Sequence, residues 1–476
     1  MGKAIGGLAR EFFDRVRDHY GKEATRRFNA AAIGSQFQLG DGGWYFEPHV
    51  AEEIFDGMLK ESGVTVYYKN RLKEGSGVVK TGNQLVALEM ENGSRYEAKL
   101  FIDAGYEGDV MAQAGVHYRV GRESAGQYHE PLAGVMPPAR HTEIGAGMEQ
   151  GIEFSISGYD AEGLLPGLYN GPRGTPGQAD VKVQAYNFRL CLTKEKKNLV
   201  PITKPAGYDP RQYEVLARLL AARAKKGGHI GLDAVLKPSP LPGGKTDVNN
   251  QGPFSTDFVN KSWNYVEAGY VERDRIYREH IDYTKGLLYF LSTSDKVPAA
   301  IREEMQQWGY AKDEFIDHDN FPCQLYIREG RRMVGDYVMV QDDVQKNIVK
   351  DDAIGMGSYE ADSHIIQRRV NGDSLVENEG QMFENIVTRP YQIPYRALTP
   401  KNSEAANLLV TICLSASHVA YQTLRMEPPF MITGQAAGTA AHLALQSGKD
   451  VQQVDIHRLQ QELTDKRAVL QFETLN

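Results

Sequence analysis

Several polar side chains follow a short apolar run near the end of the sequence. Residues 407–414 are rich in β-branched residues and predict a buried strand. Ser415, Ser417, His418 and Tyr421 come directly after this run. Hydroxyl and imidazole groups gathered at the end of a strand could bind a ligand or accept a proton.

A helix of small residues is predicted next, because Pro428 and Pro429 fit only at or before the first turn of a helix. One face of this helix carries almost no side chain and permits close approach of a bulky group. The N-terminus of such a helix suits a phosphate or a delocalised negative charge, although a tightly packed helix without a ligand has the same spacing. The small residues of this face are Gly434, Ala437, Gly438, Ala441 and Ala444.

Two further groups of charged residues could take part in chemistry. Asp362 and His364 are two residues apart, which places them on the same face of a predicted strand. A histidine beside a carboxylate can act as a general base, and a structural histidine has the same pattern. The other group, which could hold a carboxylate or phosphate or form a solvated face, is Arg328, Arg331 and Arg332.

An apolar strand is predicted to end at Asp103, Ala104 and Gly105, before an acidic loop that contains Glu107. The carboxyl edge of a sheet is a common place for a ligand. Glycine at the end of a strand also serves turn geometry alone, so this feature leaves both interpretations open.

The composition narrows the class of protein. A chain of 476 residues is long enough for two or three domains, and a net charge of −8 offers no basic surface for nucleic acid. Three distant cysteines have no metal-ligand or disulfide spacing, so no metal is expected.

The apolar stretch near the end is shorter than the ~20 residues of a membrane span. Because residues 1–20 lack the apolar core of a signal peptide, we expect a cytoplasmic protein.

Hydrophobic periodicity predicts the elements that position these residues. Residues 130–260, rich in proline and glycine, look like a separate, loop-rich domain or insertion. The predicted helices are 1–20, 48–62, 110–114, 213–225, two within 273–308, and 454–463; the predicted strands are 64–68, 85–90, 96–104, 326–340 and 407–414, with a hairpin turn at Asn92-Gly93.

Taken together, these segments resemble FAD-dependent oxidoreductases built on the glutathione-reductase type of fold, and most closely a branch in which some members are named xanthan lyase. The resemblance covers nearly the whole chain. Its motifs are IGGLAREF (5–12), FEPHVAE (46–52), LFIDAGYEGDVMAQAGV (100–116), VGRES (120–124), REGRRMVGDYVM (328–339), GSYEADSH (357–364), IPYRAL (393–398), and SASHVAY with LRMEPPFMITGQAAGTAA in the C-terminal stretch.

The resemblance implies an α/β fold in which residues 1–125 and 395–476 form the FAD-binding domain and residues 126–394 an inserted α+β substrate domain. It implies that the strand ending at Asp103, Ala104 and Gly105 passes close to the cofactor, and that a helix beginning near Gly434 and Gln435 points its N-terminus at the flavin. The full set of implied cofactor-binding residues is Asp103, Ala104, Gly105, Glu107, Ser415, Gly434, Gln435 and Gly438.

The sequence departs from this family at one point. Members begin with a βαβ unit whose GxGxxG turn holds the pyrophosphate, and no GxGxxG occurs in this chain. We therefore expect a truncated start at an internal Met, an unpaired edge in the parallel sheet, and impaired FAD binding.

Three functions follow as hypotheses. The first is a flavoenzyme that takes a hydride from a small or carbohydrate-like substrate, with His364 and His418 as candidate bases and Arg425 or Arg331 holding an anionic group. The second is a polysaccharide lyase or hydrolase that uses Tyr421, His418 and Arg425. The third is a non-catalytic remnant of a flavoprotein. Sequence does not predict the oligomeric state.

Overall fold

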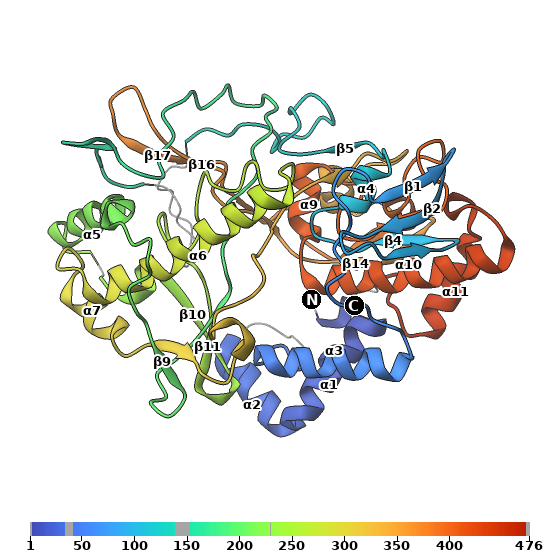
Figure 1. The fold of residues 1–476 in the computed structure, drawn as a ribbon, viewed down its shortest axis with the longest axis horizontal. Helices are drawn as coiled ribbons and strands as arrows, with labels where there is room; N and C mark the ends of the chain where they lie inside the picture. Colours follow the sequence, from blue (N-terminus) through green and yellow to red (C-terminus); the bar gives the residue numbers. More distant parts are fainter. Residues whose placement is uncertain (1, 34–40, 139–151, 229, 473–476) are drawn as a thin grey trace.

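Two large hydrophobic cores organise the molecule (Figure 1). The computed structural model describes residues 2–33, 41–138, 152–228 and 230–472. One core, on the left in the figure, gathers side chains between residues 156 and 376 around the long helix α6 (Tyr270–Thr293). The part of the molecule around it is called the left-hand lobe. The other core, on the right, consists mainly of side chains from residues 339–463, and the part around it is called the right-hand lobe. The chain is a mixed α/β protein, and the domain boundaries expected after residues 125 and 394 stay predictions.

Three helices lie together at the bottom of the molecule in Figure 1. Phe12, Phe13 and Val16 of the first helix form a small apolar core with Ala51 and Ile54 of the third. Pro48 opens the third helix, where no N–H is required, and Gly63 ends it in the left-handed region at φ +68°. The helices predicted over 1–20 and 48–62 are thus confirmed. The three helices are α1 (Gly7–Tyr20), α2 (Lys22–Ile33) and α3 (Pro48–Ser62).

The strands predicted between residues 64 and 104 form only in part. An antiparallel sheet includes the hairpin predicted at Asn92-Gly93. The strand predicted over 64–68 is wrong, because among the described residues this segment joins no ladder, and Tyr68 is 71% exposed. Its alternating pattern favours a strand, but a strand also needs a neighbouring edge. The sheet consists of β1 (Val78–Thr81), β2 (Gln84–Glu89) and β3 (Arg95–Glu97).

A parallel pair of strands connects distant parts of the right-hand lobe. The strand predicted over 96–104 breaks after β3, and its second part, β4 (Phe101–Asp103), pairs with β20 (Leu408–Val410). Val410 is the register partner of Asp103, so the two predicted polar corners follow neighbouring strands. Both corners therefore lie at the same carboxyl edge.

A five-stranded antiparallel sheet forms much of the left-hand lobe, in the order β10-β11-β8-β12-β9. The sequence did not predict this sheet, because prolines made residues 130–260 look like loops. Pro238 and Pro240 are tolerated since β10 is an edge strand, where an N–H on the solvent side can be missing. The strands are β8 (Leu190–Thr193), β9 (Leu199–Pro201), β10 (Leu236–Leu241), β11 (Lys245–Asn250) and β12 (Gly309–Ala311).

Short ladders and helices complete the fold. The helices predicted over 110–114, 213–225, 273–308 and 454–463 are confirmed, whereas the strand predicted over 326–340 shrinks to two residues. No helix in the described ranges is both long and apolar enough to cross a lipid bilayer. The ladders pair β5 (Tyr118–Arg119) with β13 (Arg332–Met333), β6 (Tyr159–Asp160) with β7 (Gly163–Leu164), β14 (Ala353–Gly357) with β19 (Tyr391–Pro394), β15 (Ala361–Ser363) with β18 (Met382–Glu384), and β16 (Gln367–Val370) with β17 (Val376–Glu379); the remaining helices are α4 (Asp109–Gln113), α5 (Glu214–Lys225), α7 (Ala299–Met305), α8 (Gln341–Gln345), α9 (His418–Leu424), α10 (Glu427–Ser447) and α11 (Ile456–Asp465).

Helix α10 begins earlier than the family resemblance implies. It starts at Glu427 and takes Pro428 and Pro429 into its first turn, as the two prolines predict, so the start near Gly434 and Gln435 implied by the resemblance is wrong. The first turn tolerates proline because its N–H groups have no partner inside the helix. Gly434 and Gln435 consequently lie inside the helix, where their N–H groups are used by the helix itself.

His280 makes the stability of the fold depend on pH. Its ring is fully buried in α6, Nδ1 lies 2.8 Å from the Ile276 carbonyl, and burial lowers its pKa from 6.5 to about 4. As the pH falls from 6.5 to 4, His280 becomes protonated in the unfolded chain but stays neutral in the folded chain. The free energy of unfolding therefore falls by up to ~3 kcal/mol. Urea denaturation at pH 7 and pH 4.5 should show a smaller difference for His280→Leu than for the parent. Substitution of the exposed His318 is the control, and an unchanged pH dependence in His280→Leu would contradict the assignment.

Candidate active site

The predicted polar corner is the start of helix α9. Ser417 caps this helix: its Oγ accepts a hydrogen bond from the Ala420 N–H at 3.2 Å and donates one to Glu130 Oε1 at 2.6 Å. The His418 N–H donates to Glu123 Oε2 at 2.9 Å. These bonds fix the position of His418, whose side chain is buried.

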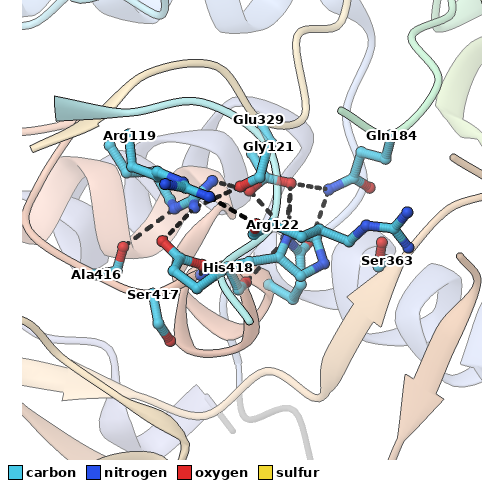
Figure 2. Close-up of polar contacts among 12 residues, drawn as sticks. Arg119, Gly121, Arg122, Gln184, Glu329, Ser363, Ala416, Ser417 and His418 are labelled. Carbon is cyan, nitrogen blue, oxygen red and sulfur yellow. Dashed lines mark hydrogen bonds and ion pairs between the residues drawn. The ribbon is translucent and has the colours of Figure 1, made fainter. Parts of the chain in front are cut away.

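The His418 ring is held by a buried glutamate (Figure 2). Nδ1 lies 2.9 Å and 3.0 Å from the two carboxylate oxygens of Glu329. Oε2 of Glu329 also accepts hydrogen bonds from Gln184 at 3.2 Å and Gln422 at 3.0 Å, while Oε1 is bound by Arg332. Burial alone would raise the pKa of Glu329, but His418 and Arg332 lower it to about 2. Glu329 is therefore a carboxylate near neutral pH.

The charge of Glu329 determines which nitrogen of His418 carries the proton. An ionised carboxylate only accepts hydrogen bonds, so Nδ1 must donate. In the neutral ring Nε2 then has a free lone pair, and within the described part of the chain no hydrogen bond reaches it. A histidine oriented in this way, with a carboxylate to stabilise its cation, can serve as a general base.

His364 forms a second carboxylate–histidine pair. Its Nδ1 lies 2.6 Å from Asp257 Oδ2, and its Nε2 is 3.8 Å from Asp362 Oδ1, as the predicted shared face requires. The other oxygen of Asp257 is 2.9 Å from Arg328. Burial first, and then the charge of Arg328, lower the pKa of His364 despite both aspartates. His364 is accordingly neutral near pH 7, and a ring whose pKa is lowered accepts a proton less readily than an ordinary histidine.

Gln184 connects the two pairs. Its Oε1 accepts the His364 N–H at 3.0 Å, and its Nε2 donates to Glu329. Arg425 joins the network through Asp362, to which its Nη2 donates at 2.9 Å. The structure thus brings together three of the four side chains proposed for catalysis, all of them buried. These three are His364, His418 and Arg425.

Arg331, the fourth candidate, has other partners. Its guanidinium donates to Asp109 at 2.8 Å, Glu267 at 2.7 Å and the Glu107 carbonyl at 2.9 Å. Neither histidine of the network contacts it, and its charge is already balanced. The arginines that are neighbours in sequence therefore serve different parts of the structure.

The two predicted cofactor segments meet. Tyr106, which follows Gly105, packs edge-on against Phe430 in the first turn of α10, with ring centroids 5.8 Å apart. Ala104 and Gly105 are exposed at this point. Asp103 is buried and accepts the Gly105 N–H at 3.0 Å and the Met111 N–H at 2.8 Å, so it shapes the turn after β4.

Two other residues predicted to bind the cofactor, Ser415 and Glu107, form hydrogen bonds with other residues of the chain. Ser415 Oγ donates to the Tyr337 carbonyl at 2.6 Å and accepts the Gly335 N–H at 3.1 Å. Glu107 accepts a long hydrogen bond of 3.4 Å from Tyr265, and burial raises its pKa. The part that these two residues play in binding FAD stays a prediction.

The small-residue face predicted for α10 is divided in the structure: Ala437, Ala441 and Ala444 are buried in the second core. The two glycines face a cavity of about 920 Å³ between α1, α10 and the end of α11. Gly434, Gln435 and Gly438 all line it. Gln435 Oε1 also accepts the Leu8 N–H at 2.8 Å and so connects α1 to α10. Open space lies above both glycines, where a Cβ would meet no atom within 4 Å.

Alanine at Gly438 tests whether this face serves the fold alone. Glycine inside an exposed helix lowers stability, so Gly438→Ala should stabilise the protein by ~0.5–1 kcal/mol in chemical denaturation. Gly57→Ala in α3 is a matched control, because its Cβ also meets open space. A loss of FAD affinity in Gly438→Ala but not in Gly57→Ala would indicate that a ligand approaches α10 here. A loss of stability would contradict the expected open space.

The partners of the two histidines escaped prediction from sequence. Asp257 and Glu329 lie far along the chain from the histidines that they bind, and Asp257 belongs to no recognised motif. Glu329 does lie within the REGRR motif, between Arg328 and two further arginines. A single acidic residue among three arginines could have indicated that Glu329 takes part in a buried charge network.

The chain matches a known protein family. The model described as FAD dependent oxidoreductase covers residues 1–463. No curated protein and no solved structure gives a significant match. Because the match covers nearly the whole sequence, the chain belongs to the FAD dependent oxidoreductases, a family whose cofactor is FAD.

Proposed function

We propose that the protein oxidises a small or carbohydrate-like substrate, with His418 as the base that removes a hydroxyl or amine proton. The observation that carries this proposal is the Glu329–His418 pair, whose Nε2 is free to accept a proton. When bound, the flavin of FAD supplies the hydride acceptor. The protein supplies the base, the orientation and the charge.

The exposed residues after β4 fit the flavin end of the cofactor. Ala104 and Gly105 leave the backbone open, and the Tyr106–Phe430 contact brings the start of α10 beside them. The positive end of a helix favours negative charge on a nearby ring. These are the groups that would hold the flavin, together with the glycine face of α10.

The start of α10 is less suited to a phosphate. Pro428 and Pro429 have no N–H, the Phe430 N–H is bonded to the Met426 carbonyl, and Glu427 adds a negative charge. The helix therefore contributes its dipole rather than a set of N–H donors. Holding the pyrophosphate requires groups other than this turn.

His418 lies near this edge of the sheet by connectivity. Helix α9 follows β20, the parallel neighbour of β4. Cys413 lies in the segment that joins β20 to α9, and its Sγ is 3.4 Å from the carbonyl oxygen of Tyr106. A proton taken up by Nε2 would be stabilised by Glu329 through Nδ1. Arg425 is less free, since its Nε and Nη2 both bind Asp362.

An absorption spectrum of the purified protein, with and without added FAD, tests the cofactor part of the proposal. A flavin spectrum followed by anaerobic bleaching with alcohols, amines or sugars is the expected result. A protein that stays colourless with added FAD would contradict it. Release of an unsaturated product from a uronic-acid polymer, without bleaching, would instead support a polysaccharide lyase.

A further inference from the structure

A second, smaller cavity lies in the left-hand lobe, away from His418. Its volume is about 170 Å³, well above the ~10–15 Å³ that one water molecule needs. One wall is α6, and the other lining residues come mainly from 166–168, 207–212 and 254–261. Arg368, on β16, lines the cavity and is 4% exposed.

Arg368 is a buried cation without a carboxylate partner among the described residues. Its Nε donates to the Asn378 amide oxygen at 3.0 Å, and its Nη2 donates to the Pro253 carbonyl at 2.6 Å. The Tyr283 hydroxyl and then the Asp257 carboxylate act on its charge, but Asp257 forms its ion pairs with Arg328 and His364. Burial lowers the pKa of Arg368.

The other deeply buried arginines differ in this respect. Each has a carboxylate oxygen within 3 Å, as Arg122 has with Glu379 and Arg425 with Asp362. Arg328 and Arg332 are paired in the same way. A buried charge is unfavourable unless it is paired, so an anion in the cavity beside Arg368 would be stabilised.

The remaining walls favour an anion with an apolar body. The Arg368 guanidinium carbon lies 4.3 Å from the centroid of the Phe254 ring, and Lys261 Nζ lies 5.9 Å from that of Phe258. Glu279 and Asp282 also line the cavity and oppose an anion, but Asp282 is exposed and its charge is screened by solvent. The buried arginine acts in a lower dielectric, where its charge has the larger effect.

We propose that this cavity binds a small carboxylate, with its head group at Arg368 and its apolar body against Phe254 and Phe258. Binding here involves neither His418 nor the cofactor. The inference therefore stands or fails separately from the proposed oxidation.

Calorimetric titration with benzoate, in a buffer free of other carboxylates, tests the site. We expect saturable binding with a Kd on the order of 1 mM or tighter. Benzamide, which has the same shape without the charge, should bind at least ~10-fold more weakly, as should benzoate to Arg368→Gln. No saturable binding, or equal binding of benzoate and benzamide, would overturn the proposal. Binding of inorganic phosphate but not of benzoate would overturn the assignment to carboxylates.

A second variant keeps the test decisive if Arg368→Gln does not fold. Asp282→Asn removes an exposed negative charge at the cavity and should tighten benzoate binding ~2-fold. Asp274→Asn, also on α6 and exposed but outside the cavity lining, is the matched control. Equal affinities of the two asparagine variants would place the benzoate elsewhere and contradict the proposal.

Discussion

Replacing His418 with Asn is expected to slow flavin reduction by ~10²–10⁴-fold, the usual contribution of a general base. The Asn side-chain amide can still donate to Glu329, so the buried carboxylate keeps a partner and the fold should survive. What is lost is Nε2, the atom that would accept the proton. Anaerobic stopped-flow measurement of flavin bleaching, with a substrate from the bleaching screen, gives the rate.

His364→Asn is the informative comparison. The pKa of His364 is lowered by burial and Arg328, and its Nε2 faces Asp362. We expect a smaller loss of rate from this variant, because a ring that resists protonation is a poor base near pH 7. His318→Asn, at an exposed position outside the network and the α10 cavity, should have no effect. A parental rate in His418→Asn would exclude His418 as the base, and a larger loss in His364→Asn would transfer the role to His364.

The sequence indicated the histidines of the site but not the acids that orient them. His418 follows a strand, and Asp362 and His364 share a strand face, which are local patterns. Glu329 and Asp257 reach these histidines through tertiary packing, and local periodicity carries no information about such contacts. The sequence also suggested that the neighbouring arginines act together. In the structure Arg331 and Arg332 point to different sides and bind separate sets of acids.

The fold was predictable where local preference and packing agree. The proline at the start of α3 and the glycine at its end set both ends of that helix. The segment 64–68 has the composition of a strand, yet a strand forms only where a partner edge exists, which sequence alone does not reveal. The prolines of β10 failed as breakers because β10 lies at the edge of its sheet, and only the topology shows that.

Lys245→Met is expected to lower the free energy of unfolding by ~3 kcal/mol, the low end of the effect of breaking a buried ion pair. Lys245 is 2% exposed, and its Nζ lies 2.7 Å from Glu47, 2.8 Å from Asp313 and 2.6 Å from Glu314. Glu47 precedes α3, whereas Lys245 begins β11, so this cation joins the N-terminal helices to the left-hand lobe. Asp313 is half exposed, which argues for the lower value.

The reason for the loss is the buried acid that Lys245 leaves behind. Glu314 is fully buried, and its other partner is His49, with Nδ1 at 2.7 Å. Glu47, His49 and Glu314 lie close enough to bind a metal ion, but Lys245 already supplies a cation to both carboxylates. Neutralising the acid as well, in Lys245→Met with Glu314→Gln, should recover part of the stability, because no uncompensated buried charge then remains.

Lys346→Met is the control for this experiment. Lys346 makes an ion pair with Asp342 at 2.7 Å on the surface of α8, where such a pair contributes only ~0.3–0.5 kcal/mol. Urea denaturation at neutral pH should therefore place Lys245→Met well below both the parent and Lys346→Met. If the two variants unfold at the same urea concentration, the contact between the N-terminal helices and β11 does not depend on this cation. The apolar contacts between those elements would then have to hold the N-terminal helices in place.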